Sequence, residues 1–233
     1  SGTITKTSSG TTDLTYISNF MNSGTFNFNG GTFVTGGAGA ATFTNAGALS
    51  FNTGTLTLNS GLALNYNPGS SVSGTGAFNN FATLNLAINL VFPSTLIFTS
   101  NGLINGAGNL TVNNDFTLQG QIFGPGTLTV NANTTWTDAW LYRAFTVDAM
   151  RTLTINTGSS KLLGANLTNN GTINWQNGNI SFNNSPTITN NSVWNITGNN
   201  TITFGSTDGI IINTGTITKS SSGSTNLESL TSF

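Results

Sequence analysis

The sequence contains no cysteine and no histidine. Without cysteine the chain can form no disulfide and offers no thiol nucleophile, and without either residue it lacks the usual ligands of zinc and haem. We therefore expect no metal site and no cofactor. The fold must be held together by backbone hydrogen bonds and apolar packing.

Charged side chains are also scarce, at 5% of the residues, compared with roughly 25% in an ordinary globular domain. The five basic residues are scattered from Lys6 to Lys219, and the formal net charge is −1. This distribution offers no basic patch for nucleic acid or for an anionic membrane surface. We expect no nucleic-acid partner, and hydroxyl and amide groups must supply most of the polar surface.

Long hydrophobic runs are missing too. No apolar run approaches the ~20 residues of a membrane helix, and no secretion signal is recognisable. We expect no membrane insertion, although 36% apolar residues are enough to bury a core. A chain poor in charge and rich in Thr and Asn is typical of exported proteins, so the composition predicts an extracellular or cell-surface location.

What the sequence does contain is a recurring short phrase: Gly, then Thr or Ala, then alternating apolar and polar residues, then a turn with Asn or Gly. Alternation with period two predicts β-strands that bury one face. Asn and Gly suit the intervening turns because they adopt positive φ cheaply. Examples of the phrase begin at Gly24, Gly47, Gly54, Gly126 and Gly171.

The spacing of these phrases indicates how the strands are connected. Gly2, Gly24 and Gly47 follow one another at nearly equal intervals, and intervals of this size fit one coil of several short strands better than a hairpin. We predict an all-β fold, a single parallel β-helix (β-solenoid) of roughly ten rungs with asparagine ladders between its turns. The alternative is an antiparallel β-sandwich array.

The sequence repeats itself over a long distance. Residues 215–233 restart the pattern of residues 2–20, with 11 of 19 positions identical, including Lys6 with Lys219 and Phe20 with Phe233. We interpret residues 1–233 as one β-solenoid repeat unit of period 213, uncapped at both ends. Identical units are the expected partners, joined head to tail into a filament with a rise of about 50 Å per unit.

One segment, 134–151, is atypical. It lies within a stretch without glycine and combines two of the four tryptophans with clustered charges. Aromatic faces can stack on sugar rings while charged groups bind hydroxyls, so the segment is a candidate glycan-binding site; the alternative is a plug that fills a widened coil. The candidate residues are Trp136, Asp138, Trp140, Tyr142 and Arg143.

An enzymatic function is the weaker interpretation. A polysaccharide-degrading β-helix needs a pair of catalytic carboxylates, and only Asp138 and Asp148 are near each other in the sequence. Arg143 and Arg151 lie close to them, which favours surface ion pairs. Recurring Thr-x-Thr triplets suggest ice or mineral binding, but their intervals are too irregular for one flat rank. We expect no catalytic residues.

The phrase Gly-Thr-Ile-Thr-Lys-x-Ser-Ser-Gly-x-Thr-x-Leu at both ends, together with residues 170–175, resembles the β-solenoid tandem repeats of very large bacterial surface and secreted, adhesin-like proteins. The resemblance implies adhesion or fibre formation, with no catalytic residues. The sequence therefore predicts a non-enzymatic structural repeat unit of an extracellular bacterial fibre or surface stalk. The alternative is a carbohydrate-binding adhesin domain, with surface glycans as partners.

Overall fold

The computed structural model describes residues 2–36, 41–227 and 230–232. The chain divides into two compact units, Ser1–Asn114 and Asp115–Phe233. In the described residues of both units the regular elements are β-strands without helices, and the paired strands run parallel. The fold is thus an all-β parallel β-solenoid of about ten turns. The predicted fold class is confirmed, and the antiparallel sandwich is wrong.

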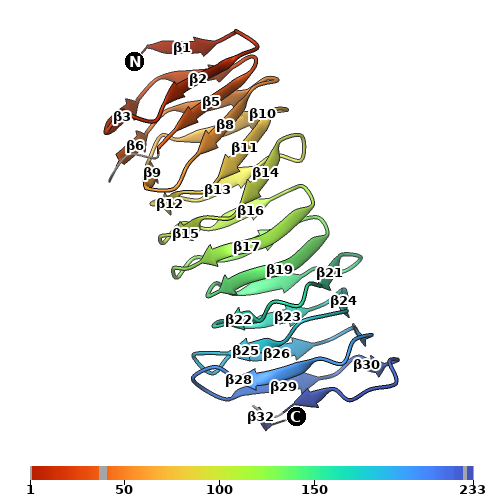
Figure 1. Ribbon diagram of the computed structural model, residues 1–233. Coiled ribbons are helices and arrows are strands. Elements are labelled where there is room, and N and C mark those ends of the chain that lie inside the picture. The colour runs from red at the N-terminus through yellow and green to blue at the C-terminus, as the bar shows by residue number, and fades with distance from the viewer. Residues whose placement is uncertain (1, 37–40, 228–229, 233) are drawn as a thin grey trace. The chain divides into compact units, whose positions relative to one another are not determined.

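Three parallel sheets line the first unit (Figure 1). The first sheet contains β1 (Thr3–Lys6), β4 (Thr25–Phe28), β7 (Ala48–Phe51) and β10 (Ser71–Gly74). The second contains β2 (Thr11–Leu14), β5 (Thr32–Thr35), β8 (Thr55–Leu58), β11 (Ala77–Asn80) and β14 (Ile97–Ser100). The third contains β3 (Asn19–Asn22), β6 (Ala41–Asn45), β9 (Leu62–Tyr66), β12 (Thr83–Leu86) and β15 (Leu103–Asn105), and β13 (Leu90–Phe92) pairs separately with β16 (Leu110–Val112).

The second unit begins with two long strands, β17 (Phe116–Ile122) and β19 (Thr134–Leu141), which pair with each other. Two series of strands follow from β19. One consists of β21 (Thr152–Ile155), β24 (Thr172–Trp175), β27 (Val193–Ile196) and β30 (Thr216–Lys219), and the other of β22 (Lys161–Leu163), β25 (Ile180–Phe182), β28 (Thr201–Phe204) and β31 (Asn226–Leu227). A further sheet contains β18 (Leu128–Val130), β20 (Phe145–Val147), β23 (Leu167–Asn169), β26 (Thr187–Asn190), β29 (Gly209–Asn213) and β32 (Leu230–Ser232).

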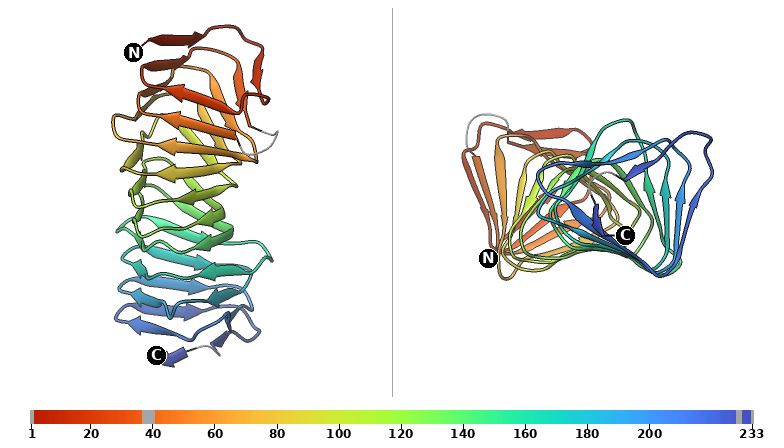
Figure 2. Two further views of the ribbon diagram at one scale, coloured as in Figure 1. Left: turned by 90° about the vertical axis from the view of Figure 1, so that its left-hand side faces the viewer. Right: turned by 90° about the horizontal axis from the view of Figure 1, so that it is seen from below.

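The register of the paired strands gives the length of each turn. Thr3 pairs with Thr25 and Thr25 with Ala48, so the first turns have the length that the glycine spacing predicted. Later turns vary: the turn that brings Leu128 beside Phe145 is shorter, and the turn that brings Thr201 beside Asn226 is longer. Loops between the strands absorb the difference, and Figure 2 shows each unit as successive coils of the chain.

Each strand buries alternate side chains, as period-two sequences require. In β4, Phe26 and Phe28 are fully buried, while Thr25 and Asn27 are partly exposed. Equivalent positions on successive turns stack inside the coil: Phe28 aligns with Phe51, and their ring centroids lie 4.7 Å apart. The Phe51 ring also stacks on Phe78 of a neighbouring sheet, with centroids 5.8 Å apart. Parallel stacking therefore aligns the apolar side chains in columns along each unit.

Asparagine ladders join the turns, as the sequence predicted. Asn22 Nδ2 donates to Asn45 Oδ1 at 2.7 Å, Asn169 Nδ2 to Asn190 Oδ1 at 2.6 Å, and Asn190 Nδ2 to Asn213 Oδ1 at 2.7 Å. Four of these side chains are buried, where an amide without a partner would cost about 1–3 kcal/mol. The ladder satisfies them by pairing one turn with the next.

The two copies of the repeated sequence contain the same local structure. Strands β1 and β30 both have the sequence TITK. The Lys6 Nζ donates to the carbonyl of Ser8 at 2.6 Å, and the Lys219 Nζ donates to the carbonyl of Ser221 at 3.0 Å. Each lysine thus fastens the serine loop that follows its own strand. The match of Phe20 with Phe233 lies outside the described residues.

Among the residues that the structure describes there is no helix with the length and hydropathy needed to cross a membrane.

Candidate functional site

Strand β19 contains most of the predicted site residues, and its side chains change faces partway along the strand. Its pairing with β17 shifts by one residue: Leu118 aligns with Trp136, but the next residue, Gln119, aligns with Asp138. Thr137 is therefore the extra residue of a β-bulge, and its hydroxyl donates to the Leu118 carbonyl at 3.2 Å. A bulge reverses the alternation of side chains beyond it. Before Thr137 the even-numbered residues of β19 point inward, and after it the odd-numbered residues do.

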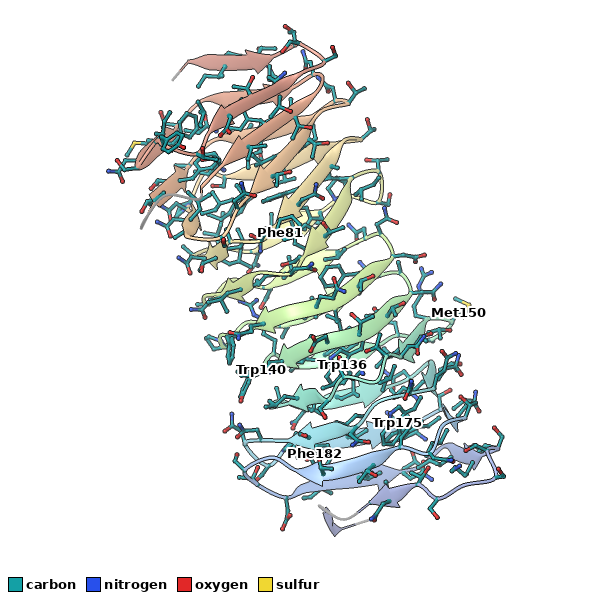
Figure 3. The ribbon with its side chains drawn as sticks, viewed as in Figure 1. Phe81, Trp136, Trp140, Met150, Trp175 and Phe182 are labelled. Carbon is teal, nitrogen blue, oxygen red and sulfur yellow. The ribbon has the colours of Figure 1, made fainter. Side chains whose placement is uncertain are left out.

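The consequence is that the two tryptophans of the segment lie on opposite faces. Trp136 is fully buried, whereas Trp140 is 44% exposed. Without the bulge, Trp136, Asp138 and Trp140 would all share one face, because each lies two positions after the last. Figure 3 shows Trp140 extending from the outer side of the unit near the end of β19, and Trp136 within the coil.

Trp136 belongs to the core. It aligns with Ile155 on the next turn, and Ile155 aligns in turn with Trp175. Both indoles have the same hydrogen bond, from Nε1 to the carbonyl three residues later: 3.1 Å to Ala139 and 2.7 Å to Gly178. Trp136 therefore fits the plug interpretation, and its ring offers no surface to a ligand.

The exposed part of the site is a small mixed patch on the outer face of β17, β19 and β22. Trp140 aligns with Gln121 on one side and with Leu162 on the other, and Asp138 aligns with Gln119. Aligned residues on adjacent strands are about 4.8 Å apart. An aromatic face thus lies beside amide and carboxylate groups, an arrangement that can stack on a sugar ring and bind its hydroxyls.

Tyr142 lies just beyond β19, at the corner of the turn, and is half-buried. One face of its ring stacks on Phe123, with centroids 4.5 Å apart and planes inclined by 20°. Its hydroxyl accepts a hydrogen bond of 2.8 Å from Asn183 Nδ2, on a turn further along the chain. Tyr142 is therefore held in place by packing and contributes only part of its edge to the surface.

Arg143, the fifth predicted residue, is 1% exposed. Its Nε donates to the carbonyl of Phe123 at 2.7 Å, and burial lowers its pKa to about 10. The guanidinium therefore stays charged at neutral pH but lies beneath the surface. The predicted set thus separates into Asp138 and Trp140 on the outer face, Tyr142 at the corner, and Trp136 and Arg143 inside.

Lys161 is a charged residue of this region that the sequence did not single out. It is fully buried at the start of β22, and its Nζ donates to the carbonyls of Thr157 at 3.1 Å and Ser159 at 2.7 Å. Burial lowers its pKa to about 8, against the opposing effect of the Asp138 charge. The lysine thus holds loop 156–160 in place. This loop separates β21 from β22, whereas β19, which pairs with both of them, is one continuous strand.

This arrangement explains why the segment is atypical. Residues 134–141 form a single continuous strand, and the next turn covers the same length with two strands and a loop. A continuous strand needs no tight turn and hence no glycine. Among the described residues, no group of three or more acidic side chains is placed to hold a metal ion.

No protein-family model, no curated protein and no solved structure matches this chain. The class that the fold defines is the parallel β-solenoid. The resemblance to bacterial surface repeats rests on the residues of the sequence alone.

Proposed function

We propose that this chain is a non-enzymatic structural repeat of an extracellular bacterial fibre or surface stalk, whose units stack head to tail. The observation that carries the proposal is the recurrence of the TITK strand of Thr3–Lys6 at Thr216–Lys219, with the same lysine contact. A turn that recurs in sequence and in local structure can occupy the same place in successive units. Such a chain needs no catalytic residues.

The first turn supports stacking through its exposed apolar surface. Ile4 aligns with the fully buried Phe26, so it occupies a core-facing position, yet it is 45% exposed. The strands of an outermost turn also present unpaired N–H and C=O groups, which bind readily to another strand. A preceding turn would cover both. Low charge together with abundant Thr and Asn supports the extracellular location by composition.

Self-association of the purified chain tests this proposal. We expect concentration-dependent assembly in sedimentation velocity and, in electron micrographs, filaments that grow end to end with a rise of about 50 Å per unit. Ile4→Asp should reduce assembly, because it places a charge in the joint. Val91→Asp is the matched control, since Val91 is 50% exposed on an outward-facing position. Monomers at all concentrations, or filaments built from lateral contacts, would contradict the proposal.

A second candidate function is a carbohydrate-binding adhesin, favoured by the exposure of Trp140 beside Gln121 and Asp138. We expect glycan binding on an array, confirmed by calorimetry, to be lost in Trp140→Ala. Phe81→Ala is the control because Phe81 is an aromatic residue of the first unit with a similar exposure, 45%. Binding that survives Trp140→Ala would remove this site.

A further inference from the structure

The asparagine ladder of the second unit has a fixed hydrogen-bond pattern. Each Nδ2 donates to the Oδ1 of the aligned asparagine on the next turn and also to the backbone carbonyl three residues beyond it. For Asn169 these acceptors are Asn190 at 2.6 Å and Val193 at 2.9 Å. For Asn190 they are Asn213 at 2.7 Å and Thr216 at 3.3 Å.

The first unit repeats this pattern at its own start. Asn22 Nδ2 donates to Asn45 Oδ1 at 2.7 Å and to the carbonyl of Ala48, three residues later, at 3.2 Å. Asn22 Oδ1 accepts from the backbone N–H of Gly24 at 3.2 Å, just as Asn169 Oδ1 accepts from Gly171 at 3.1 Å. Asn22 thus has the same role as the asparagines of the second unit.

The strand register shows which residue would follow Asn213 in the ladder. In the last turn Gly209 pairs with Leu230, the register then shifts by one residue, and Ile210 pairs with Ser232. Asn213 lies three residues after Ile210, so its partner is the third residue after Ser232. Because the pattern of residues 2–20 restarts at 215–233, that position corresponds to Asn22.

We infer that the two ladders are parts of one continuous ladder, in which Asn213 donates to Asn22 of the next repeat. By the pattern above, its second acceptor is the carbonyl of the next repeat's Thr25. The partner is the following repeat of the same chain, stacked on the last turn. This inference rests on the proposed head-to-tail function and adds the contact that sets the register of the joint.

The groups at both sides of the joint fit this contact. Asn213 is exposed, and its Nδ2 makes a long hydrogen bond of 3.3 Å to the carbonyl of Gly215. The observed ladder of the first unit ends at Asn45, which aligns with Tyr66 on the next turn. With no asparagine to follow, the Asn45 Nδ2 likewise donates to a nearby carbonyl, that of Gly47. An amide oxygen has two acceptor positions, and Asn190 uses its own Oδ1 for Asn169 in the way proposed for Asn22.

The contact would also exclude other registers. A slip of one residue moves every side chain to the opposite face of its strand. Asn213 would then lie opposite a position equivalent to Met21 or Ser23, and neither side chain offers an amide oxygen. Because burying an unpaired amide is unfavourable, the ladder selects one register for the joint.

A double-mutant cycle in a tandem chain tests the inference. The tandem chain consists of residues 1–233 followed directly by residues 21–233 of a second copy. The substitutions are Asn213→Ala in the first copy and Asn22→Ala in the second, separately and together. We expect the pair to be coupled by about fivefold in the unfolding equilibrium constant, the size of one net hydrogen bond. Asn213→Ala in the single chain removes the acceptor of Asn190 Nδ2, so it should change that constant by about fivefold, the size of that one hydrogen bond.

The control substitution is Asn191→Ala. Asn191 is an exposed neighbour of the ladder whose Nδ2 donates to Asn170 Oδ1 at 2.8 Å, so it should show no coupling with the second copy's Asn22. A second measurement does not depend on how the variants fold: by NMR, the Nδ2 protons of Asn213 should exchange with solvent at least tenfold more slowly in the tandem chain than in the single chain.

The outcomes separate the inference from the proposed function. If the tandem chain is more stable than the single chain but Asn213 shows neither coupling nor slowed exchange, the repeats stack and the continuous ladder is wrong. If the tandem chain gains no stability and its two copies unfold independently, the head-to-tail function itself is wrong, and the ladder with it. Coupling and slowed exchange together support both.

Discussion

The ring of Tyr142 occupies the space that a side chain at Gly164 would need. A Cβ placed on Gly164 would lie 2.4 Å from both Cδ1 and Cε1 of Tyr142, closer than unbonded carbon atoms can approach. The two residues belong to adjacent turns, because the Gly164 N–H donates to the carbonyl of Leu141, the residue before Tyr142. The absence of a side chain at Gly164 therefore determines where the Tyr142 ring lies.

Gly164→Ala should displace Tyr142 and lower the free energy of unfolding by about 1–3 kcal/mol, the usual cost of overpacking. Tyr142→Ala should largely rescue Gly164→Ala, because it removes the clash. Gly158→Ala is the control, since no atom lies within 4 Å of a Cβ at that position. Urea unfolding of the four variants measures the cycle. Additive losses without rescue would show that the strain lies elsewhere.

The two tryptophans of β19 should respond oppositely to substitution. Trp136→Ala removes a fully buried indole and should cost about 3–5 kcal/mol of stability, whereas Trp140→Ala should cost less than about 1 kcal/mol. In Trp136→Phe, a milder substitution, acrylamide quenching should still detect the exposed Trp140. If Trp140→Ala proved as destabilising as Trp136→Ala, the placement of the two tryptophans on opposite faces of β19 would be contradicted.

Lys161 should make stability depend on pH. Its pKa is lowered from the ordinary 10.5 to about 8 in the folded protein, so above pH 8 the unfolded state binds more protons than the folded state. Stability must then rise with pH in this range. We expect the thermal midpoint to increase from pH 8 to about 10, and the increase between pH 8 and 9 to be lost in Lys161→Met. Arg151→Met, which removes an exposed charge, should preserve it.

The upper limit of that pH range comes from Tyr66, whose pKa is raised by burial to about 12. Above pH 10 the unfolded tyrosine loses its proton more readily than the folded one, and stability falls. Arg143, whose pKa burial lowers to about 10, also adds to the rise as the pH approaches 10, so measurements between pH 8 and 9 isolate the lysine. A thermal midpoint that stays constant between pH 8 and 10 in the unsubstituted protein would refute the expected role of Lys161.

Lys6 should stabilise the loop that follows β1. Its Nζ donates to the carbonyls of Ser8 at 2.6 Å and Gly10 at 2.9 Å. Lys6→Met retains the apolar part of the side chain but leaves these acceptors without their donor, so we expect a loss of about 1–3 kcal/mol. Hydrogen exchange should quicken in residues 7–10 and remain unchanged around Lys161. Unchanged exchange throughout would contradict a fastening role.

Sequence reasoning succeeded where the structure is periodic. Alternation of apolar and polar residues located the strands, and the spacing of Gly2, Gly24 and Gly47 matched the register of Thr3 with Thr25 and Ala48. The ladder of Asn22 and Asn45 followed from the same stacking. Parallel turns repeat each environment, so a local pattern suffices to predict these features.

Sequence reasoning failed where one residue interrupts the alternation of buried and exposed side chains. Thr137 has no sequence signal that marks it as a bulge, yet it alone sends Trp136 inward and Trp140 outward. The neighbours of Trp140 could not be foreseen either. Because the turns differ in length, the alignment of Trp140 with Gln121 and Leu162 depends on the lengths of the loops. The composition of the patch is therefore a tertiary property.

The hydrogen bonds of the two ladders that begin at Asn22 and Asn169 point the same way along the chain, whereas asparagine pairs elsewhere, such as Asn191 with Asn170, point the opposite way. In these two ladders each donor amide belongs to the earlier turn and each acceptor to the later one, from Asn22 to Asn45 and from Asn169 through Asn190 to Asn213. A column of aligned amides has a polarity, with an acceptor at one end and a donor at the other. Two chains that met by like ends would oppose two donors or two acceptors. A fibre of such units is therefore directional, and its two tips are chemically different surfaces.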